Sequence, residues 1–234
     1  QTICSVDLGI NTDAVCTIMR PDGTILGRKF INFSSDKDRM YRVLGRIRRF
    51  QREHGSRQVQ GRWAYAKRLN TELGKKIARE IVFYASENRA DVIVFEYLEM
   101  KGKLSGKKKQ KLQMWRKRDI QKRCGQQAHR KEIRISRICA WNTSRLAFDG
   151  SGKIDRDIQD HRLCTFQNGK RYNCDLSASY NIGARYFIRE ILKPLPATER
   201  SLLEAKVPAV KRRTSCVYAD LRDLISEMEL RKAA

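Results

Sequence analysis

Two acidic residues interrupt apolar runs whose composition predicts buried β-strands. Asp7 lies within "CSVDLGI" and Glu96 lies within "VIVFEYL". Aspartate is depleted in strands, and burying a carboxylate without a partner is costly. Packing alone therefore explains neither acid, and the fold of this chain has to place both where their charge is compensated.

The order of the apolar segments predicts a mixed sheet flanked by helices. Three apolar stretches are separated by the turn signals Asn11-Thr12 and Pro21-Asp22-Gly23, which favours a three-stranded antiparallel meander. Periodicity and short apolar runs predict these elements in chain order: strands in 2–10, 13–19 and 25–33, helices over 36–54 and 63–88, a strand over 90–100, a helix ending near 130, a strand over 132–141, and helices over 175–192 and 217–231. This order is the layout of an RNase H-like α/β domain.

The composition favours a polyanionic partner. The chain of 234 residues has 50 Lys and Arg against 26 Asp and Glu, a formal net charge of +24. A surface this basic most often binds nucleic acid. A membrane surface is the competing partner, but the sequence has no apolar run of the roughly 18 residues that a spanning helix needs and no signal peptide. The chain starts at Gln1 rather than Met, so we expect a piece of a larger protein.

A third acid, Asp175, opens the predicted helix over 175–192. In a mixed sheet the first strand and the strand bearing Glu96 can be neighbours, and a helix packed across them can bring its first turn to the same edge. Three carboxylates at one edge suit phosphodiester hydrolysis with two Mg²⁺ ions, since Mg²⁺ prefers oxygen ligands and such ion pairs lie about 3.5–4 Å apart. The sequence therefore predicts a two-metal site built from Asp7, Glu96 and Asp175.

Each acid alone also has a structural explanation. Asp7 precedes Gly9 and Asn11 and could start a turn, and Glu96 could lie on a polar face near a strand end. Asp175 is suited to the N-cap or first turn of its helix. The combination of three such acids in a strongly basic chain is far more specific than any one of them.

Three segments around these acids resemble the split RuvC motifs of type V CRISPR effector nucleases and their TnpB relatives: "SVDLGIN", "VIVFEYL" and "CDLSASYNIGAR". The segment "AWNTSRLA" is similar to the stretch that precedes the zinc-ribbon insert of that family, and "VKRRTSC" is similar to its C-terminal tail. The resemblance implies an RNase H-like (RuvC) fold with Asp7, Glu96 and Asp175 as the catalytic, Mg²⁺-binding acids. It implies minor supporting roles for Ser177 and Asn181.

The resemblance also divides the chain. Residues 1–141 correspond to the first two parts of the RuvC core with a helical insert and a basic loop, 142–174 to a degenerate zinc-ribbon-like insert that binds target nucleic acid, and 175–234 to the third part and tail. The insert lacks a CxxC pair, because "SRLAFDG" has no cysteine and "CTFQ" has Gln167 at the partner position. Cys164 and Cys174 cannot complete a tetrahedral sulfur site, so we expect no zinc and a surface position for His161.

Basic runs and aromatic residues supply the candidate nucleic-acid contacts. Backbone contacts are expected from a basic helix and from a lysine-rich loop after the Glu96 strand, at Arg46, Arg48, Arg49, Arg52, Lys103, Lys107, Lys108, Lys109, Lys111 and Arg116. Trp115 is the candidate for base stacking. The alternatives are a solvated helix face and a solvated loop. Trp63 and Trp141 are expected in the core.

The three acids predict a Mg²⁺-dependent endonuclease domain, and the resemblance implies that it belongs to a guide-RNA-directed, DNA-targeting effector of antiviral defence. The expected partners are guide RNA, target DNA and an upstream recognition lobe of the same polypeptide, with no membrane. The seven cysteines form no CxxC pair, which favours reduced thiols and the cytoplasm of a prokaryote. Three alternatives remain: a guided DNA-binding protein that cuts little or no DNA, a nuclease that matures its guide RNA, and a DDE transposase.

Overall fold

A mixed five-stranded sheet forms the centre of the computed structural model, which describes residues 1–9, 12–55, 59–97, 117–212 and 214–233. The strand order is β3-β2-β1-β4-β5, where β1 is Ile3–Asp7, β2 Ala14–Met19, β3 Ile25–Ile31, β4 Val92–Tyr97 and β5 Arg134–Cys139. β1, β2 and β3 pair antiparallel, whereas β4 pairs parallel to both β1 and β5. The expected meander and mixed sheet are confirmed.

Side-chain alternation along β1 and β4 gives the sheet two apolar faces. Cys4 and Val6 point into one core with Ile93 and Phe95, which helices α2 (Gln60–Glu87) and α4 (Lys117–His129) cover. The intervening residues of the two strands point into the opposite core, which helices α5 (Cys174–Leu192), α6 (Ala197–Lys206) and α7 (Tyr218–Ala233) cover. Asp7 and Glu96 share the register of this second face.

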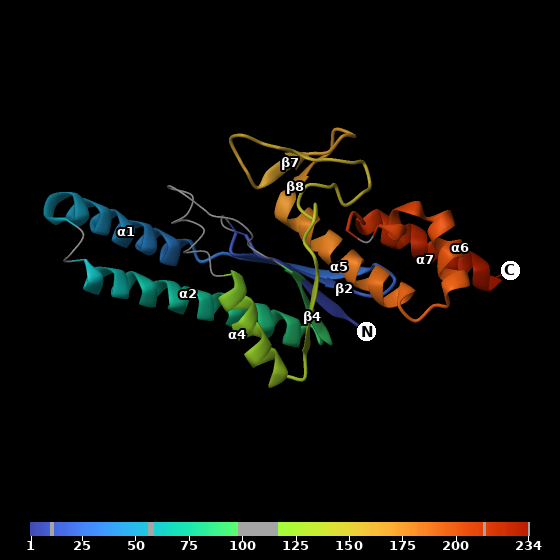
Figure 1. Ribbon diagram of the computed structural model, residues 1–234, viewed down its shortest axis with the longest axis horizontal. Coiled ribbons are helices and arrows are strands. Elements are labelled where there is room, and N and C mark those ends of the chain that lie inside the picture. The colour runs from blue at the N-terminus through green and yellow to red at the C-terminus, as the bar shows by residue number, and fades with distance from the viewer. Residues whose placement is uncertain (10–11, 56–58, 98–116, 213, 234) are drawn as a thin grey trace.

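Helix α1 (Ser34–His54) and the first half of α2 project beyond the sheet as an antiparallel arm (Figure 1). Their contact is a small core of Met40, Leu44, Ile47 and Ala66, and Trp63 packs against it as expected. The expectation of a buried Trp141 is wrong, because this side chain is 67% exposed. Strand β5 ends at Cys139, so Trp141 lies in a turn beyond the reach of either core.

The segment between β5 and α5 folds as a small three-stranded antiparallel sheet, ordered β6 (Asp155–Arg156), β7 (Leu163–Thr165) and β8 (Arg171–Asn173). Its core contains Cys164, Cys174 and Phe166, with Phe148 and Tyr172 packed against them. Phe148 also contacts the rings of Tyr180 in α5 and Tyr218 in α7. This aromatic cluster attaches the small sheet to the second face of the main domain, above α5 in Figure 1.

Two helical segments near the C-terminus were absent from the sequence prediction, α6 and a 3₁₀ turn over Pro208–Lys211. Pro194 and Pro196 do follow the end of α5, but Pro196 is also the N-cap of α6, so the chain resumes a helix at once.

All seven cysteines carry free thiols, and six of them are buried. No helix in the described ranges is long and apolar enough to cross a membrane.

Helix α5 packs very close to the sheet through small residues at a helical spacing of four. Ser179 hydrogen-bonds the hydroxyl of Thr17 in β2 at 2.6 Å. One turn further on, a Cβ added to Gly183 would lie 2.9 Å from Cε of Met19 and 3.2 Å from Oγ of Ser5. Asp175 lies one turn before Ser179, so the same close approach brings its helical turn down to the sheet.

We expect Gly183→Val to destabilise the fold by about 1–3 kcal/mol, because its side chain would overlap Met19, which is fully buried. Denaturant unfolding measures this effect. The matched control is Gly45→Ala in α1, where an added Cβ meets nothing within 4 Å. That variant should be about 0.5–1 kcal/mol more stable than the wild type, since alanine favours the helix. Equal effects of the two changes would contradict the close packing of α5.

Candidate active site

Asp7 and Glu96 lie at the carboxyl ends of neighbouring parallel strands, on the same face of the sheet. Val6 of β1 pairs with Phe95 of β4, so the next residues along both strands are Asp7 and Glu96. Each of the two side chains is only 7% exposed. Because both carboxylates point toward α5, the sheet itself brings the first two predicted acids together.

Asp175 reaches the same place from the first turn of α5. Asn173 is the N-cap of this helix and accepts a hydrogen bond from the backbone N–H of Leu176 at 2.9 Å. Asp175 is therefore not needed as the cap, and its half-buried carboxylate accepts a hydrogen bond from the hydroxyl of Thr12. Asp175 is thus a first-turn acid of α5 rather than its N-cap, and from that position it lies beside Asp7.

The three carboxylates interact electrostatically. Burial is the main cause that raises the pKa of Asp7 well above its usual value, and the charges of Glu96 and Asp175 raise it further. Burial also raises the pKa of Asp175. Crowded, partly desolvated carboxylates of this kind are stabilised by a cation.

Two cationic side chains lie beside the acids, and the sequence analysis named neither. Lys117 at the start of α4 and Arg156 in β6 both oppose the rise in the pKa of Asp7 and of Asp175. Burial lowers the pKa of Lys117, while Asp7, Glu96 and Asp175 oppose that shift. Lys117 lies in a basic run and Arg156 lies between two aspartates, so neither segment marks its cation as different from a solvated charge, and only the fold does so.

The turn after β5 orients Glu96. The buried hydroxyl of Thr143 donates a hydrogen bond to Oε1 of Glu96. Nδ2 of Asn181 in α5 donates to the carbonyls of Thr143 at 3.0 Å and Leu146 at 2.9 Å, while its Oδ1 accepts from the backbone N–H of Tyr218. Asn181 therefore holds the turn and the start of α7 together, a larger role than the minor one expected for it.

Ser177 and Arg185 fix the two ends of the same turn. Oγ of Ser177 accepts from the backbone N–H of Phe148 at 3.2 Å. Arg185, only 4% exposed, donates from Nη1 to the carbonyls of Cys139 at 2.9 Å and Trp141 at 2.7 Å. Residues 139–148 are thus attached to one face of α5 along its length.

The donor set fits a hard divalent cation in chemistry, since it offers three carboxylates at one edge with an excess of negative charge. Among the residues that the structure describes, however, no group of three or more His, Cys, Asp or Glu side chains is clustered closely enough to hold a metal ion. Asp7, Glu96 and Asp175 are therefore neighbours rather than a preformed ligand shell. Lys117 and Arg156 supply the positive charge beside them.

The predicted basic contacts divide into described and undescribed residues. Arg46, Arg48, Arg49 and Arg52 are all exposed on α1, and within the described ranges none of them has an ion pair. The contacts predicted for the loop lie outside the described residues, namely Lys103, Lys107, Lys108, Lys109, Lys111, Trp115 and Arg116. The arm formed by α1 and α2 thus presents these exposed arginines on its first helix.

The small sheet brings Cys164 and Cys174 within hydrogen-bonding reach of each other. His161 is exposed, and its Nδ1 contacts the carbonyl of Asp157 at 3.1 Å. The position expected for His161 is confirmed, and the absence of zinc stays a prediction.

Comparison with solved structures identifies the fold. The chain is similar to a Cas12f1 protein solved by cryo-EM as a Cas12f1-sgRNA-target DNA complex, with a TM-score of 0.62 and 19% identity over 77% of this chain and 49% of that one. It is also similar to a Cas12f in a CRISPR ternary complex, with a TM-score of 0.54 and 16% identity over 77% of this chain and 38% of that one. The chain thus spans about half or less of the Cas12f chains that it matches.

At these identities the likeness establishes the fold. The chain has an RNase H-like α/β fold that it shares with the Cas12f structures, and the predicted fold class is confirmed. The sequence matches no model of a known protein family and no curated protein.

We expect Asn181→Ala to lower the free energy of unfolding by about 2–4 kcal/mol, because it leaves the carbonyls of Thr143 and Leu146 without their donor. The control Asn168→Ala removes an exposed amide that donates to Asp149 and accepts from the backbone N–H of Lys170 at the surface, and should change stability by about 1 kcal/mol or less. Denaturant unfolding of both variants measures the difference. Similar losses in the two would show that Asn181 does not anchor the turn.

We expect Asp7→Asn to stabilise the protein at neutral pH in EDTA. The pKa of Asp7 is raised in the folded state, so the wild type loses stability as pH rises from the ordinary aspartate range through that raised pKa. Below the ordinary range Asp7 is protonated in both states, and the advantage of Asn should disappear. Thermal unfolding at a series of pH values measures this dependence.

The matched control is Asp13→Asn. Asp13 is as deeply buried as Asp7, but it is paired with Lys37 at 3.3 Å and accepts a hydrogen bond from the backbone N–H of Phe33. Removing this paired charge should lower stability at neutral pH. An Asp7→Asn variant that is equally destabilised would contradict the crowding of charge at the candidate site.

Proposed function

We propose that this chain is the metal-dependent nuclease domain of an RNA-guided effector, with Asp7, Glu96 and Asp175 as its catalytic acids. The observation that carries the proposal is the convergence of three carboxylates from β1, β4 and α5 in a chain with a net charge of +24. The fold shared with Cas12f supports it. We retain the division into a RuvC core over 1–141, an insert over 142–174 and a third part over 175–234.

The residues of the chain have distinct tasks in this proposal. Asp7, Glu96 and Asp175 would hold two Mg²⁺ ions, which when bound supply Lewis acidity at the phosphodiester. Thr143 keeps Oε1 of Glu96 in a fixed direction. Lys117 and Arg156 offset the charge of the acids and offer cationic contacts to a phosphate group. The hydrolysis of a DNA strand would leave a 3′-hydroxyl and a 5′-phosphate.

The proposed partners are a guide RNA, its target DNA and an upstream recognition lobe. One similar structure is a complex with sgRNA and target DNA. This chain covers 49% and 38% of the two matched Cas12f chains, which supports a further lobe in the same polypeptide. The exposed arginines of α1 would bind the backbone of a guide–target duplex by its charge and shape. The proposed setting is prokaryotic antiviral defence.

A second function follows from a specific observation. Since no three acidic side chains among the described residues form a ready ligand cluster, and Lys117 lies beside them, the site can fail to load metal. The protein would then hold DNA through its guide without cutting it, or use the site only to trim its guide RNA. Both alternatives keep the fold and the basic surface.

The decisive experiment incubates the intact protein and its guide RNA with Mg²⁺, labelled matched DNA and labelled guide precursor. We expect DNA cleavage by the wild type and a loss of more than about 100-fold in Asp7→Ala, Glu96→Ala and Asp175→Ala, since even changes outside the ligand shell of a metal cost 10–100-fold. DNA binding measured in EDTA should persist in all three variants, because the basic surface is unchanged.

Glu229→Ala is the matched control, since it removes an exposed acid of α7 far along the chain from the site. It should cleave like the wild type. Tight but uncut DNA in every sample would overturn the nuclease proposal in favour of guided binding. Trimming of the precursor alone would leave a guide-processing enzyme.

A further inference from the structure

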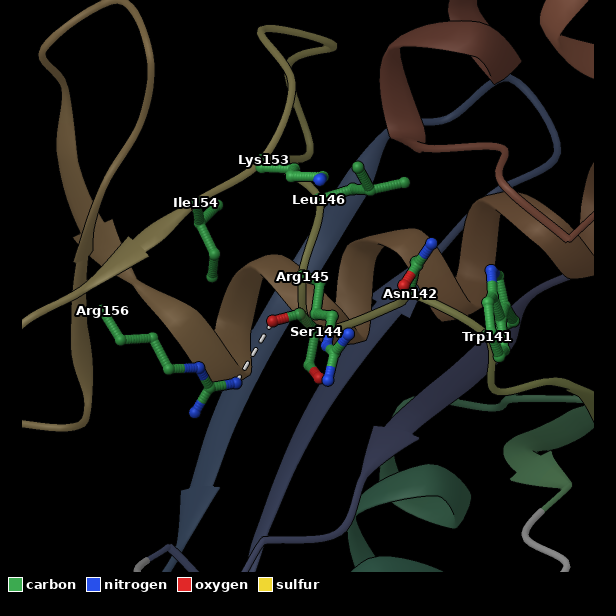
Figure 2. A pocket seen from close by; sticks show the side chains of 8 residues that line it. All are labelled: Trp141, Asn142, Ser144, Arg145, Leu146, Lys153, Ile154 and Arg156. Atoms are coloured by element: carbon green, nitrogen blue, oxygen red, sulfur yellow. Dashed lines mark hydrogen bonds between the residues drawn. The ribbon is translucent and has the colours of Figure 1, made fainter.

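A cavity of about 730 Å³ opens beside the candidate site, between the turn after β5 and the small sheet. Its lining comes from two stretches of chain, 141–146 and 153–156, and includes Trp141, Arg145, Lys153 and Arg156. Figure 2 shows Trp141 and Arg156 at opposite ends of this lining, with Ser144 and Arg145 between them. Cavities of this size, roughly 300–1,000 Å³, are typical of small-ligand and cofactor sites.

The indole of Trp141 packs into none of the hydrophobic cores of the described structure. It is 67% exposed, although tryptophan usually buries most of its surface. The contact that secures this residue is made by its main-chain carbonyl, which accepts a hydrogen bond from Arg185 at 2.7 Å. The side chain is therefore held in place by its backbone while its ring remains available to a ligand.

The charge of the cavity selects for an anion. Arg145, Lys153 and Arg156 are exposed, none has an ion pair in the described structure, and none of the eight described lining residues is acidic. Arg156 is positioned by a hydrogen bond from Nη2 to the carbonyl of Ser144 at 3.2 Å, and its charge reaches Asp7 and Asp175. A cation that lines the cavity therefore also acts on the carboxylates of the candidate site.

A flat aromatic ring, three cations and the polar side chains of Asn142 and Ser144 match the parts of a nucleotide. We propose that the cavity holds one unpaired nucleotide of a nucleic-acid strand, with its base stacked on Trp141 and its adjoining phosphates bound by Arg145, Lys153 and Arg156. The inference rests on the proposed function, because it names where the strand entering the carboxylate site is held. A base stacked inside a duplex cannot offer its face to the indole, so the nucleotide must be extruded or single-stranded.

The test uses the intact protein in EDTA, so that binding is measured without cleavage. The probe is a fluorescent single-stranded DNA that carries 5-iodouracil at successive positions, and its photo-crosslinks are mapped to peptides. We expect one probe position to crosslink to Trp141. Trp141→Ala should abolish that crosslink and weaken binding by about 5- to 150-fold, the range of one base–aromatic stack, whereas Trp141→Phe should retain most of the affinity.

An abasic nucleotide at the crosslinked position completes a double-mutant cycle. It should weaken binding to the wild type but add little in Trp141→Ala, because the same stack is already lost. The control Phe83→Ala removes another exposed aromatic side chain, on α2, and should leave both crosslink and affinity unchanged. Additive losses, or crosslinks that persist in Trp141→Ala, would overturn the inference. Since no step needs cleavage, its failure is separate from that of the proposed nuclease.

Discussion

The close packing of α5 on the sheet is the constraint on which the candidate site depends. Asp7 and Glu96 are brought together by the pairing of β1 with β4, but Asp175 belongs to a helix, and its distance from the strands is set by side-chain size. Ser179 and Gly183 keep that distance short, since a Cβ at Gly183 would lie 2.9 Å from Met19 and 3.2 Å from Ser5, so that both neighbours would have to shift. Larger residues on this face would lift the third carboxylate away from the other two.

The close approach of α5 to the sheet also has a cost in local stability, because it crowds the three acids together. Three crowded and partly buried carboxylates are unfavourable by themselves, as the raised pKa of Asp7 shows. Lys117 and Arg156 compensate part of this charge from α4 and β6. These elements come from different parts of the chain, so the fold brings cations as well as carboxylates to this edge of the sheet. Because the negative charge of the three acids is only partly compensated within the protein, their position favours the binding of a further cation.

The sequence predicted the elements whose signals are local. The periodicity of β1, β4 and α5 indicated a mixed sheet, and the acids that interrupt those elements indicated the edge where they meet. The cations beside them could not be found in this way, because Lys117 and Arg156 resemble every other basic residue in a chain with 50 of them. Trp141 was misplaced because an apolar residue after an alternating strand was counted with the strand, which ends at Cys139. Helix α6 was missed since proline was taken only as a breaker, although Pro196 begins it.

The turn "AWNTSRLA" would connect the proposed nucleotide binding to the proposed chemistry in a single segment. Thr143 points inward and fixes Glu96, while Trp141 and Arg145 line the cavity on the other side. Asn181 and Arg185 attach the backbone of this turn to α5, the helix that also carries Asp175. A strand held by the outer residues would therefore bear on the same turn that orients Glu96. Because the attachment is to backbone carbonyls, the outer side chains can vary with the ligand while the position of Thr143 is preserved.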